Sequence, residues 1–378
     1  MSDPRIQRWA ETLTRYCLYV KPGEVVEIGA TPLAAPLVEA VYREVLRAGG
    51  YPLTRISLPD LSMSPSLNEV LLNEGSEEQL TFLSPLEQAR AETIHARLSI
   101  GSEANVRGLA NIDPARQALA QRAERQLRKR FGEREQQGTF KWCGTLYPTN
   151  AYAQNAGMSL ADFTEFVYEA CFLNDEHPAE RWRELGAKQQ RSVDWLKGKK
   201  RVRILGRDTD LSLSIEGRTF INSDGKRNFP SGEFFTGPVE DSAEGTIRYT
   251  VPSAHSGRVV QDIRLRFHQG EVVEATAAQG QEFLEQMLKM DDGARWLGEF
   301  AFGNNFGITR GIANTLFDEK IGGTVHLALG NSYPETGGKN ASALHWDMVC
   351  DLRPEAGGGE VWVDDTLFLK DGRLLIAG

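Results

Sequence analysis

The sequence predicts an α/β N-terminal domain with a parallel sheet, followed by an α+β C-terminal domain that carries a metal site. Three observations lead to this fold class. The chain has 378 residues, which exceeds one ordinary hydrophobic core. Its opening alternates helices with strands, and from Lys199 onward it contains short alternating strands separated by Gly and Asp turns. We place the boundary near residue 195, which gives domains of residues 1–195 and 196–378.

The opening of the chain has the pattern of helix, strand, helix and strand. Arg5–Tyr19 carries apolar residues at helical spacing, and Glu24–Ala30 follows a Pro-Gly turn as a strand. Leu33–Ala48 is amphipathic and ends at Gly49-Gly50, and Tyr51–Leu58 is the next strand. Such a βαβ unit implies parallel strands with helices packed on them.

Further elements follow in both domains. Helices are predicted at Pro85–Thr93, Pro114–Phe131, Ser159–Leu173 and Ala179–Leu196. Strands are predicted at Arg201–Leu205, Leu211–Ile215, Gly245–Val251, Val259–Phe267 and Glu271–Ala278, with a helix at Gly280–Leu288. The chain ends with strands at Glu360–Val363, Leu367–Lys370 and Arg373–Ile376, the last two joined as a hairpin.

Composition excludes several classes of function. A net charge of −9 does not favour binding to a phosphate backbone, and the charged run of residues 114–137 is typical of a solvated helix face. No apolar stretch is long enough to span a bilayer, and the N-terminus lacks a signal-peptide pattern. We therefore expect no nucleic-acid partner and no membrane. The four cysteines show no CxxC spacing, which fits reduced thiols in the cytoplasm: Cys17, Cys143, Cys171 and Cys350.

The dense polar motifs lie between residues 231 and 351. Glu233 stands beside two phenylalanines in Ser231–Pro238, and Glu299 stands in a similar Gly- and Phe-rich setting in Gly298–Gly303. A carboxylate near apolar neighbours needs a cation or hydrogen-bond donors. Each glutamate is therefore either a metal ligand or a surface or salt-bridged group.

Two histidines complete the set of candidate ligands. His326 interrupts an apolar strand, where it is either a ligand or a core histidine with a hydrogen-bond partner. His345 and Asp347 are two residues apart, so a strand would point both toward one face, as metal ligands or as a hydrogen-bonded pair. Three carboxylates and two imidazoles suit a dinuclear site, in which two cations lie ~3.5–4 Å apart. The other histidines are interpreted as surface or helix-end residues: His95, His177, His255 and His268.

These motifs, in this order, resemble the thermophilic-type aminopeptidases, the dinuclear metallopeptidase group of aminopeptidase T, aminopeptidase S and PepS. The resemblance extends over nearly the full length. It is most specific in residues 316–340 and 344–353, and residues 15–50 also resemble the family's N-terminal domain. The family's metal ligands match Glu233, Glu299, His326, His345 and Asp347, and a site tyrosine of the family matches Tyr333.

The resemblance implies removal of the N-terminal residue from short peptides, by a homodimer with an enclosed cavity and two divalent ions. Mixed oxygen and nitrogen ligands admit Zn, Co, Mn or Mg. Glu299 is expected also to carry the proton to the leaving amine, and Tyr333 to donate to the oxyanion or to ligate a metal.

Two other functions and one group of residues stay open at this point. Ligand chemistry alone also admits a two-metal phosphoesterase, although few basic residues lie near the motifs. The second alternative is a non-enzymatic binding or scaffold protein with structural histidines. It is less favoured, because five residues of suitable ligand types would then occur together by chance. Glu319, Lys320 and Arg310 are candidates for supporting the ligands, but their pattern favours ordinary surface charges.

Overall fold

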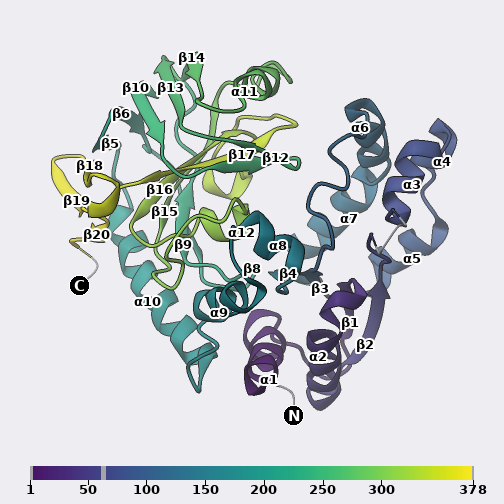
Figure 1. Cartoon of the computed structure of the whole chain (residues 1–378). Helices are drawn as coiled ribbons and strands as arrows, with labels where there is room; N and C mark the ends of the chain where they lie inside the picture. Colours follow the sequence, from purple (N-terminus) through teal and green to yellow (C-terminus); the bar gives the residue numbers. More distant parts are fainter. Residues whose placement is uncertain (1–2, 61–64, 377–378) are drawn as a thin grey trace. The chain divides into compact units, whose positions relative to one another are not determined.

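The structure is a computed structural model that describes residues 3–60 and 65–376. The chain divides into two compact units (Figure 1). Unit 1 contains Met1–Ala179 and Lys226–Phe229, and unit 2 contains Glu180–Gly225 and Pro230–Gly378. Residue 195, the predicted boundary, lies near the end of the long helix α10 (Pro178–Leu196). The assignment of the domains as 1–195 and 196–378 stays a prediction.

Unit 1 contains a parallel five-stranded sheet in the order β2-β1-β3-β4-β8, which confirms the predicted α/β region. The strands are β1 (Val25–Ala30), β2 (Tyr51–Ile56), β3 (Ala96–Gly101), β4 (Lys141–Leu146) and β8 (Asn228–Phe229). The βαβ unit of the opening is present as β1, helix α2 (Ala35–Arg47) and β2. Strands β3 and β4 had not been recognised in the sequence.

The other helices of unit 1 connect or flank these strands. They are α1 (Pro4–Glu11), α3 (Leu67–Glu74), α4 (Glu77–Thr81), α5 (Pro85–Thr93), α6 (Pro114–Ala123), α7 (Arg125–Gln136), α8 (Asn150–Asn155) and α9 (Leu160–Ala170). The prediction of one helix over Pro114–Phe131 is wrong, because the helix is interrupted at Glu124, which separates α6 from α7. α1 continues as a π-helical turn, Thr12–Cys17, within the predicted first helix.

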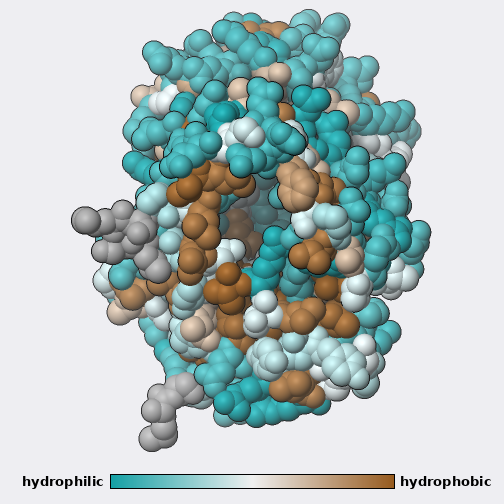
Figure 2. Space-filling model, turned by 90° about the vertical axis from the view of Figure 1, so that its right-hand side faces the viewer, coloured by the Kyte–Doolittle hydropathy of each residue, from teal (hydrophilic) through white to brown (hydrophobic). Residues whose placement is uncertain are grey.

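Unit 1 also exposes an unusual number of hydrophobic side chains. They include Tyr42 and Leu46 on α2 and Leu53 and Ile56 on the edge strand β2. The end of β2 and α2 line a groove of about 590 Å³. Figure 2 shows the side of the molecule that is on the right in Figure 1, where hydrophobic residues gather around a hollow.

Unit 2 contains two larger antiparallel sheets. One has eight strands in the order β14-β13-β10-β6-β5-β18-β19-β20, and the other has five in the order β17-β16-β15-β9-β7. The eight-stranded sheet comprises β5 (Arg201–Gly206), β6 (Thr209–Ser214), β10 (Glu244–Tyr249), β13 (Ile263–His268), β14 (Glu271–Thr276), β18 (Gly359–Val363), β19 (Thr366–Lys370) and β20 (Arg373–Leu374). The five-stranded sheet comprises β7 (Ile221–Ser223), β9 (Glu233–Thr236), β15 (Leu297–Gly303), β16 (Thr324–Gly330) and β17 (His345–Asp351).

Most of α10 also belongs to unit 2, and the other elements of this unit are short. β11 (Ser253–His255) pairs with β12 (Arg258–Val260), and the helices are α11 (Gln281–Met287) and α12 (Thr315–Asp318). The prediction of one strand over Val259–Phe267 is wrong, because Asp262 adopts a positive φ of 53° and separates β12 from β13.

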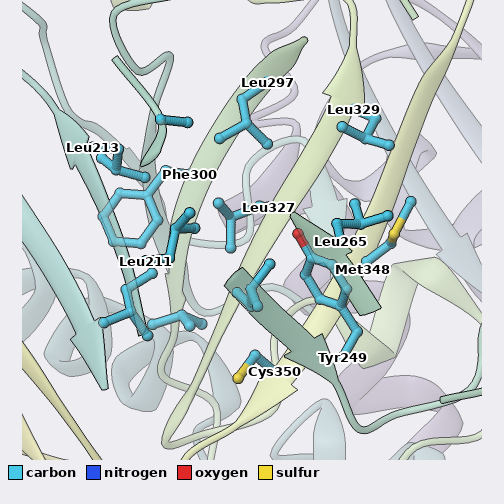
Figure 3. Packing of buried hydrophobic residues seen from close by; sticks show 14 of the residues in the cluster. Leu211, Leu213, Tyr249, Leu265, Leu297, Phe300, Leu327, Leu329, Met348 and Cys350 are labelled. Atoms are coloured by element: carbon cyan, nitrogen blue, oxygen red, sulfur yellow. The ribbon is translucent and has the colours of Figure 1, made fainter. Parts of the chain in front are cut away.

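The main core of unit 2 lies between its two larger sheets (Figure 3). Leu211 and Leu265 come from the eight-stranded sheet, and Phe300, Leu327 and Met348 come from the five-stranded sheet. Burial of this apolar surface fixes which face of each strand points inward. The opposite face of the five-stranded sheet is therefore the one left for polar side chains.

The four cysteines are buried and free, as their spacing predicts. Within residues 3–60 and 65–376, no helix has the length and apolar character that crossing a bilayer requires.

Candidate metal centre

The candidate ligands lie on the face of the five-stranded sheet that is turned away from the core. Successive side chains of a strand point to opposite faces. In β16, Val325 and Leu327 belong to the core, so His326 between them points to the other face. In β17, Trp346 and Met348 belong to the core, so His345 and Asp347 share that same face.

Glu233 and Glu299 reach this face by the same alternation. Phe234 of β9 packs in the core and leaves Glu233 on the opposite side. In β15, a register shift between Leu297 and Glu299 lets Leu297 and Phe300 both join the core while Glu299 points away. The bulge therefore decides the direction of Glu299.

The strands that carry these residues are neighbours, and small residues separate the ligands. Ala328 of β16 is the register partner of both Glu299 and Asp347. Gly330 lies opposite His345, and Gly303 lies opposite Glu233. A Cβ at Gly330 would meet the carbonyl of Leu344, and one at Gly303 would meet the carbonyl of Ile321, so both positions require glycine.

The five predicted ligands come together around His326 and Glu299. His326 Nε2 lies 3.2 Å from Glu299 Oε1, 3.7 Å from Glu233 Oε2 and 3.9 Å from Asp347 Oδ1. His345 Nε2 lies 3.5 Å from both Glu299 Oε2 and Asp347 Oδ1. The side chains are largely buried, and only His345 is as much as 27% exposed.

These atoms form two triads that share one carboxylate. Glu233, Glu299 and His326 make one triad, and Glu299, His345 and Asp347 make the other, with the donor atoms of each within 4.8 Å of one another. Each triad offers oxygen and imidazole nitrogen, which suits a borderline divalent cation. The arrangement could hold two ions with Glu299 between them.

The segment before Glu233 is anchored by a glycine with a special conformation. Gly232 has a φ of +112°, and a Cβ there would lie 2.7 Å from Cβ of Asn305. Asn305 is fully buried, and its Nδ2 donates to Ser231 O at 2.9 Å. The backbone carbonyl of Glu233 accepts from Gln189 Nε2 at 3.0 Å. These contacts fix where the Glu233 side chain begins.

The electrostatics show that the cluster requires positive charge. Burial lowers the pKa of His345, but the charges of Asp347 and Glu299 prevail and raise it to about 10. Burial also lowers the pKa of His326, while its hydrogen bond to Glu299 and the charge of Glu233 raise it above the usual value. Burial raises the pKa of Asp347, but His345 holds it well below its usual range. Protons on the imidazoles supply the charge that cations would otherwise bring.

The donor atoms fit divalent cations in two further respects. Glu233 Oε2 and Asp347 Oδ1 are buried and have no hydrogen-bond partner within the described parts of the chain, an arrangement that is costly unless another group binds them. His345 Nδ1 lies 2.9 Å from the carbonyl of Asn331 and must donate to it. Nε2 therefore carries the second proton of the imidazolium, and loss of that proton to a cation would leave its lone pair directed at the triads.

Tyr333 lies at the side of the centre. Its ring centroid is 5.2 Å from that of His345 and 5.4 Å from that of Phe235, and the residue is 38% exposed. Burial and the charges of Glu299 and Asp347 raise the pKa of its phenol, so the hydroxyl keeps its proton. This position places a neutral donor next to the ligands.

Two residues that the sequence pattern favoured as surface charges are buried beside the centre. Lys320 is 0% exposed and lies 3.3 Å from Glu233, and the Glu319 side chain is 12% exposed. The interpretation of these two as surface residues is wrong, because the turn after α12 directs them inward. Arg310 is exposed, as favoured. A charged triplet three residues before the buried strand β16 was the signal that could have drawn attention to them.

The other histidines stay outside the two triads. His177 and His268 are exposed, as expected, and His268 pairs with Glu244. His95 is half-buried and its Nδ1 accepts from Val25 N. His95 also directly follows the C-cap of α5, which fits a helix-end residue. His255, by contrast, is half-buried in β11 with its ring 5.5 Å from that of Trp346, so the surface or helix-end interpretation is wrong for His255.

The cluster of carboxylates and histidines is that of a candidate metal-dependent enzyme, and comparison with known proteins identifies the family. The chain belongs to the thermophilic metalloprotease family M29, whose model matches residues 2–373. This confirms the family that the sequence motifs predicted, and with it the class of enzyme, a metal-dependent protease.

Several characterised relatives are similar over most of their length. Aminopeptidase 2 of Geobacillus stearothermophilus is 29% identical, covering 98% of this chain and 95% of the relative. Aminopeptidase T of Thermus thermophilus is 26% identical, covering 87% of this chain and 85% of the relative.

Two solved structures share the fold. The structure of wild-type AmpT from Thermus thermophilus matches with a TM-score of 0.82 at 24% identity, covering 99% of both chains. A 2,5-dihydroxypyridine dioxygenase from Pseudomonas putida KT2440 matches with a TM-score of 0.59 at 14% identity, covering 99% of this chain and 98% of the other. Since the second protein has a different activity, the fold alone does not determine the reaction.

Proposed function

We propose that this protein is an aminopeptidase that removes the N-terminal residue from short peptides with the help of two divalent cations. The observation that carries the proposal is the pair of donor triads sharing Glu299 on one face of a sheet. Membership of a metalloprotease family supports the metal, and the names of the relatives support the exopeptidase activity.

The proposed roles of the ligands follow from the two triads. Glu233 and His326 would hold one ion, His345 and Asp347 the other, and Glu299 would bridge them. When bound, such a pair of cations lowers the pKa of a water molecule and polarises the scissile carbonyl. The mixed ligand set admits Zn, Co, Mn or Mg.

Two residues are proposed to act on the substrate. Tyr333 keeps its proton because its pKa is raised, so its hydroxyl would donate a hydrogen bond to the oxyanion that develops on the carbonyl. Glu299 lies between the triads, and we propose that its carboxylate also carries the proton to the leaving amine.

The acidic surroundings support a preference for a free N-terminus. The α-amine of a peptide is a cation, and the carboxylates of Glu233, Glu299 and Asp347 lie at the centre. A blocked N-terminus would lose this attraction. Two further properties are part of this proposal. The family resemblance implies a homodimer with an enclosed cavity, and the free cysteines fit a cytoplasmic location.

The test compares substrates under control of the metal. Metal-free protein and protein reloaded with Zn²⁺ or Co²⁺ are assayed on an aminoacyl anilide, its N-acetylated form and an aryl phosphate ester. We expect metal-dependent cleavage of the free anilide alone. Glu299→Gln should remain folded and lose activity by about 10²–10⁴-fold, the range of general acid–base catalysis. Turnover of the phosphate ester instead, or normal activity of Glu299→Gln, would refute the proposal.

A further inference from the structure

Lys320 is a lysine with no solvent exposure at all. Lysine is almost never fully buried unless it is paired with an anion. Its Nζ lies 3.3 Å from Glu233 Oε1 and contacts the carboxylate of Glu319. The ammonium group therefore lies directly behind one of the proposed metal ligands, between two carboxylates.

The backbone around Lys320 fixes this position. Its N–H donates to the carbonyl of Phe317, and its own carbonyl accepts from the N–H of Asn305, both at 3.0 Å. Asn305 in turn donates through Nδ2 to the carbonyl of Ser231, two residues before Glu233. The segment with Lys320 and the segment with Glu233 are thus tied to the same buried asparagine.

The turn that leads into Lys320 is fixed from the other side as well. The carboxylate of Asp318 accepts from the backbone N–H groups of Ile312 and Asn314 at 2.8 and 2.9 Å. These contacts fix the backbone on both sides of Lys320, and full burial with the two ion pairs restricts its side chain.

Because of the contact with Lys320, the two carboxylate oxygens of Glu233 have different surroundings. Oε1 faces the ammonium group, while Oε2 has no hydrogen bond within the described residues and lies 3.7 Å from His326 Nε2. Groups that hold the far side of a ligand commonly orient it and set its affinity for the metal. The same ammonium group compensates the charge of Glu319, which together with His326 and Asp347 forms a third group of possible donors.

We propose that Lys320 is a positioning residue of the metal centre, which holds Oε1 of Glu233 so that Oε2 binds the ion of the Glu233–Glu299–His326 triad. Its second effect is to neutralise Glu319, which therefore supports the centre without being a ligand. This inference rests on the proposed two-metal function.

The experiment measures metal affinity and not turnover. Metal-free protein is titrated with Zn²⁺ in competition with a chromophoric chelator, for the wild type, Lys320→Met, Lys320→Arg and Lys370→Met. Lys370 is the matched control, because its Nζ pairs with Glu360 at 3.2 Å on the surface of the same unit. Thermal unfolding is recorded for each protein with and without metal.

We expect Lys320→Met to lower the affinity for one of the two ions by about 10- to 100-fold and to leave the affinity for the other nearly unchanged. The rise in melting temperature on adding Zn²⁺ should shrink accordingly. Lys320→Arg should recover much of the affinity, and Lys370→Met should behave as the wild type. Wild-type affinity for both ions in folded Lys320→Met would overturn the role of Lys320.

A second variant covers the case in which Lys320→Met does not fold, since that change leaves two buried carboxylates uncompensated. Glu319→Gln combined with Lys320→Met removes one charge of each sign and retains Glu233. It should fold and still bind one ion more weakly than the wild type, and unchanged affinity for both ions would overturn the proposal. A wild-type chain that takes up no metal would instead refute the metal centre itself, so the two failures are distinguishable.

Discussion

Gly232→Ala tests whether backbone geometry beside Glu233 positions the metal centre. The substitution forces alanine into a φ of +112°, a region that is costly for residues with a side chain by about 1–3 kcal/mol. The new Cβ would also meet the Asn305 Cβ at 2.7 Å, and overpacking of a buried site typically costs about 1–3 kcal/mol. Together these terms give an expected loss of about 2–6 kcal/mol in the free energy of unfolding.

Gly217→Ala is the matched control within the same unit. Gly217 also has a positive φ, +73°, but a Cβ there would meet nothing within 4 Å. Only the left-handed conformation is then penalised, at about 1–2 kcal/mol. The difference between the two variants reports the contact with Asn305 together with the less favourable φ of Gly232.

The assay is denaturant unfolding of the metal-free proteins, followed by tryptophan fluorescence, together with metal content after reloading. Gly232→Ala should be the less stable variant and should bind less metal, because Glu233 follows directly. Gly217→Ala should bind the wild-type amount. If Gly232→Ala were no less stable than Gly217→Ala and held its full metal content, the reasoning about this segment would be wrong.

The remaining predictions concern chemistry at the centre. Tyr333→Phe should lower kcat by about 10²–10³-fold at unchanged metal content, as expected for loss of one oxyanion donor, and a parallel loss of metal would show that Tyr333 is a ligand. In metal-free protein, His345 has a pKa of about 10 against 6.5 as its usual value, so its contribution to stability is complete below about pH 6.5 and is lost as the pH rises through 10. Unfolding of the wild type and of His345→Ala between pH 6 and 10 measures this, and equal pH slopes for both proteins would contradict it. Because a cation must displace the protons on His326 and His345, Zn²⁺ affinity should increase from pH 6 to pH 8, which chelator competition at each pH would detect.

Local patterns predicted much of the fold, because short-range periodicity determines which face of an element is apolar. The opening βαβ unit was predicted in this way, and so was α5, which has the predicted bounds Pro85–Thr93. The break at Glu124 was not predictable, since residues on both sides of it favour a helix. Strands β3 and β4 were missed, although β3 alternates between buried and more exposed residues, because each is short and the charged helical segments around them dominate the pattern.

The candidate site shows the same division between local and long-range information. The HxD spacing predicts that His345 and Asp347 share a face, and the strand geometry gives that result. That β9, β15, β16 and β17 are neighbours depends on sheet order, which no single motif contains. Lys320 was misjudged because its charge suggests solvent, while its position depends on Asn305 and Glu233, which are distant in sequence.

The central claim is that two divalent ions share Glu299. A crystal structure of metal-loaded protein with anomalous data collected at the metal absorption edge would test it most directly. The account predicts two anomalous peaks, one beside Glu233 and His326 and the other beside His345 and Asp347, with the carboxylate of Glu299 between them. A single peak, or peaks away from this face of the five-stranded sheet, would contradict it.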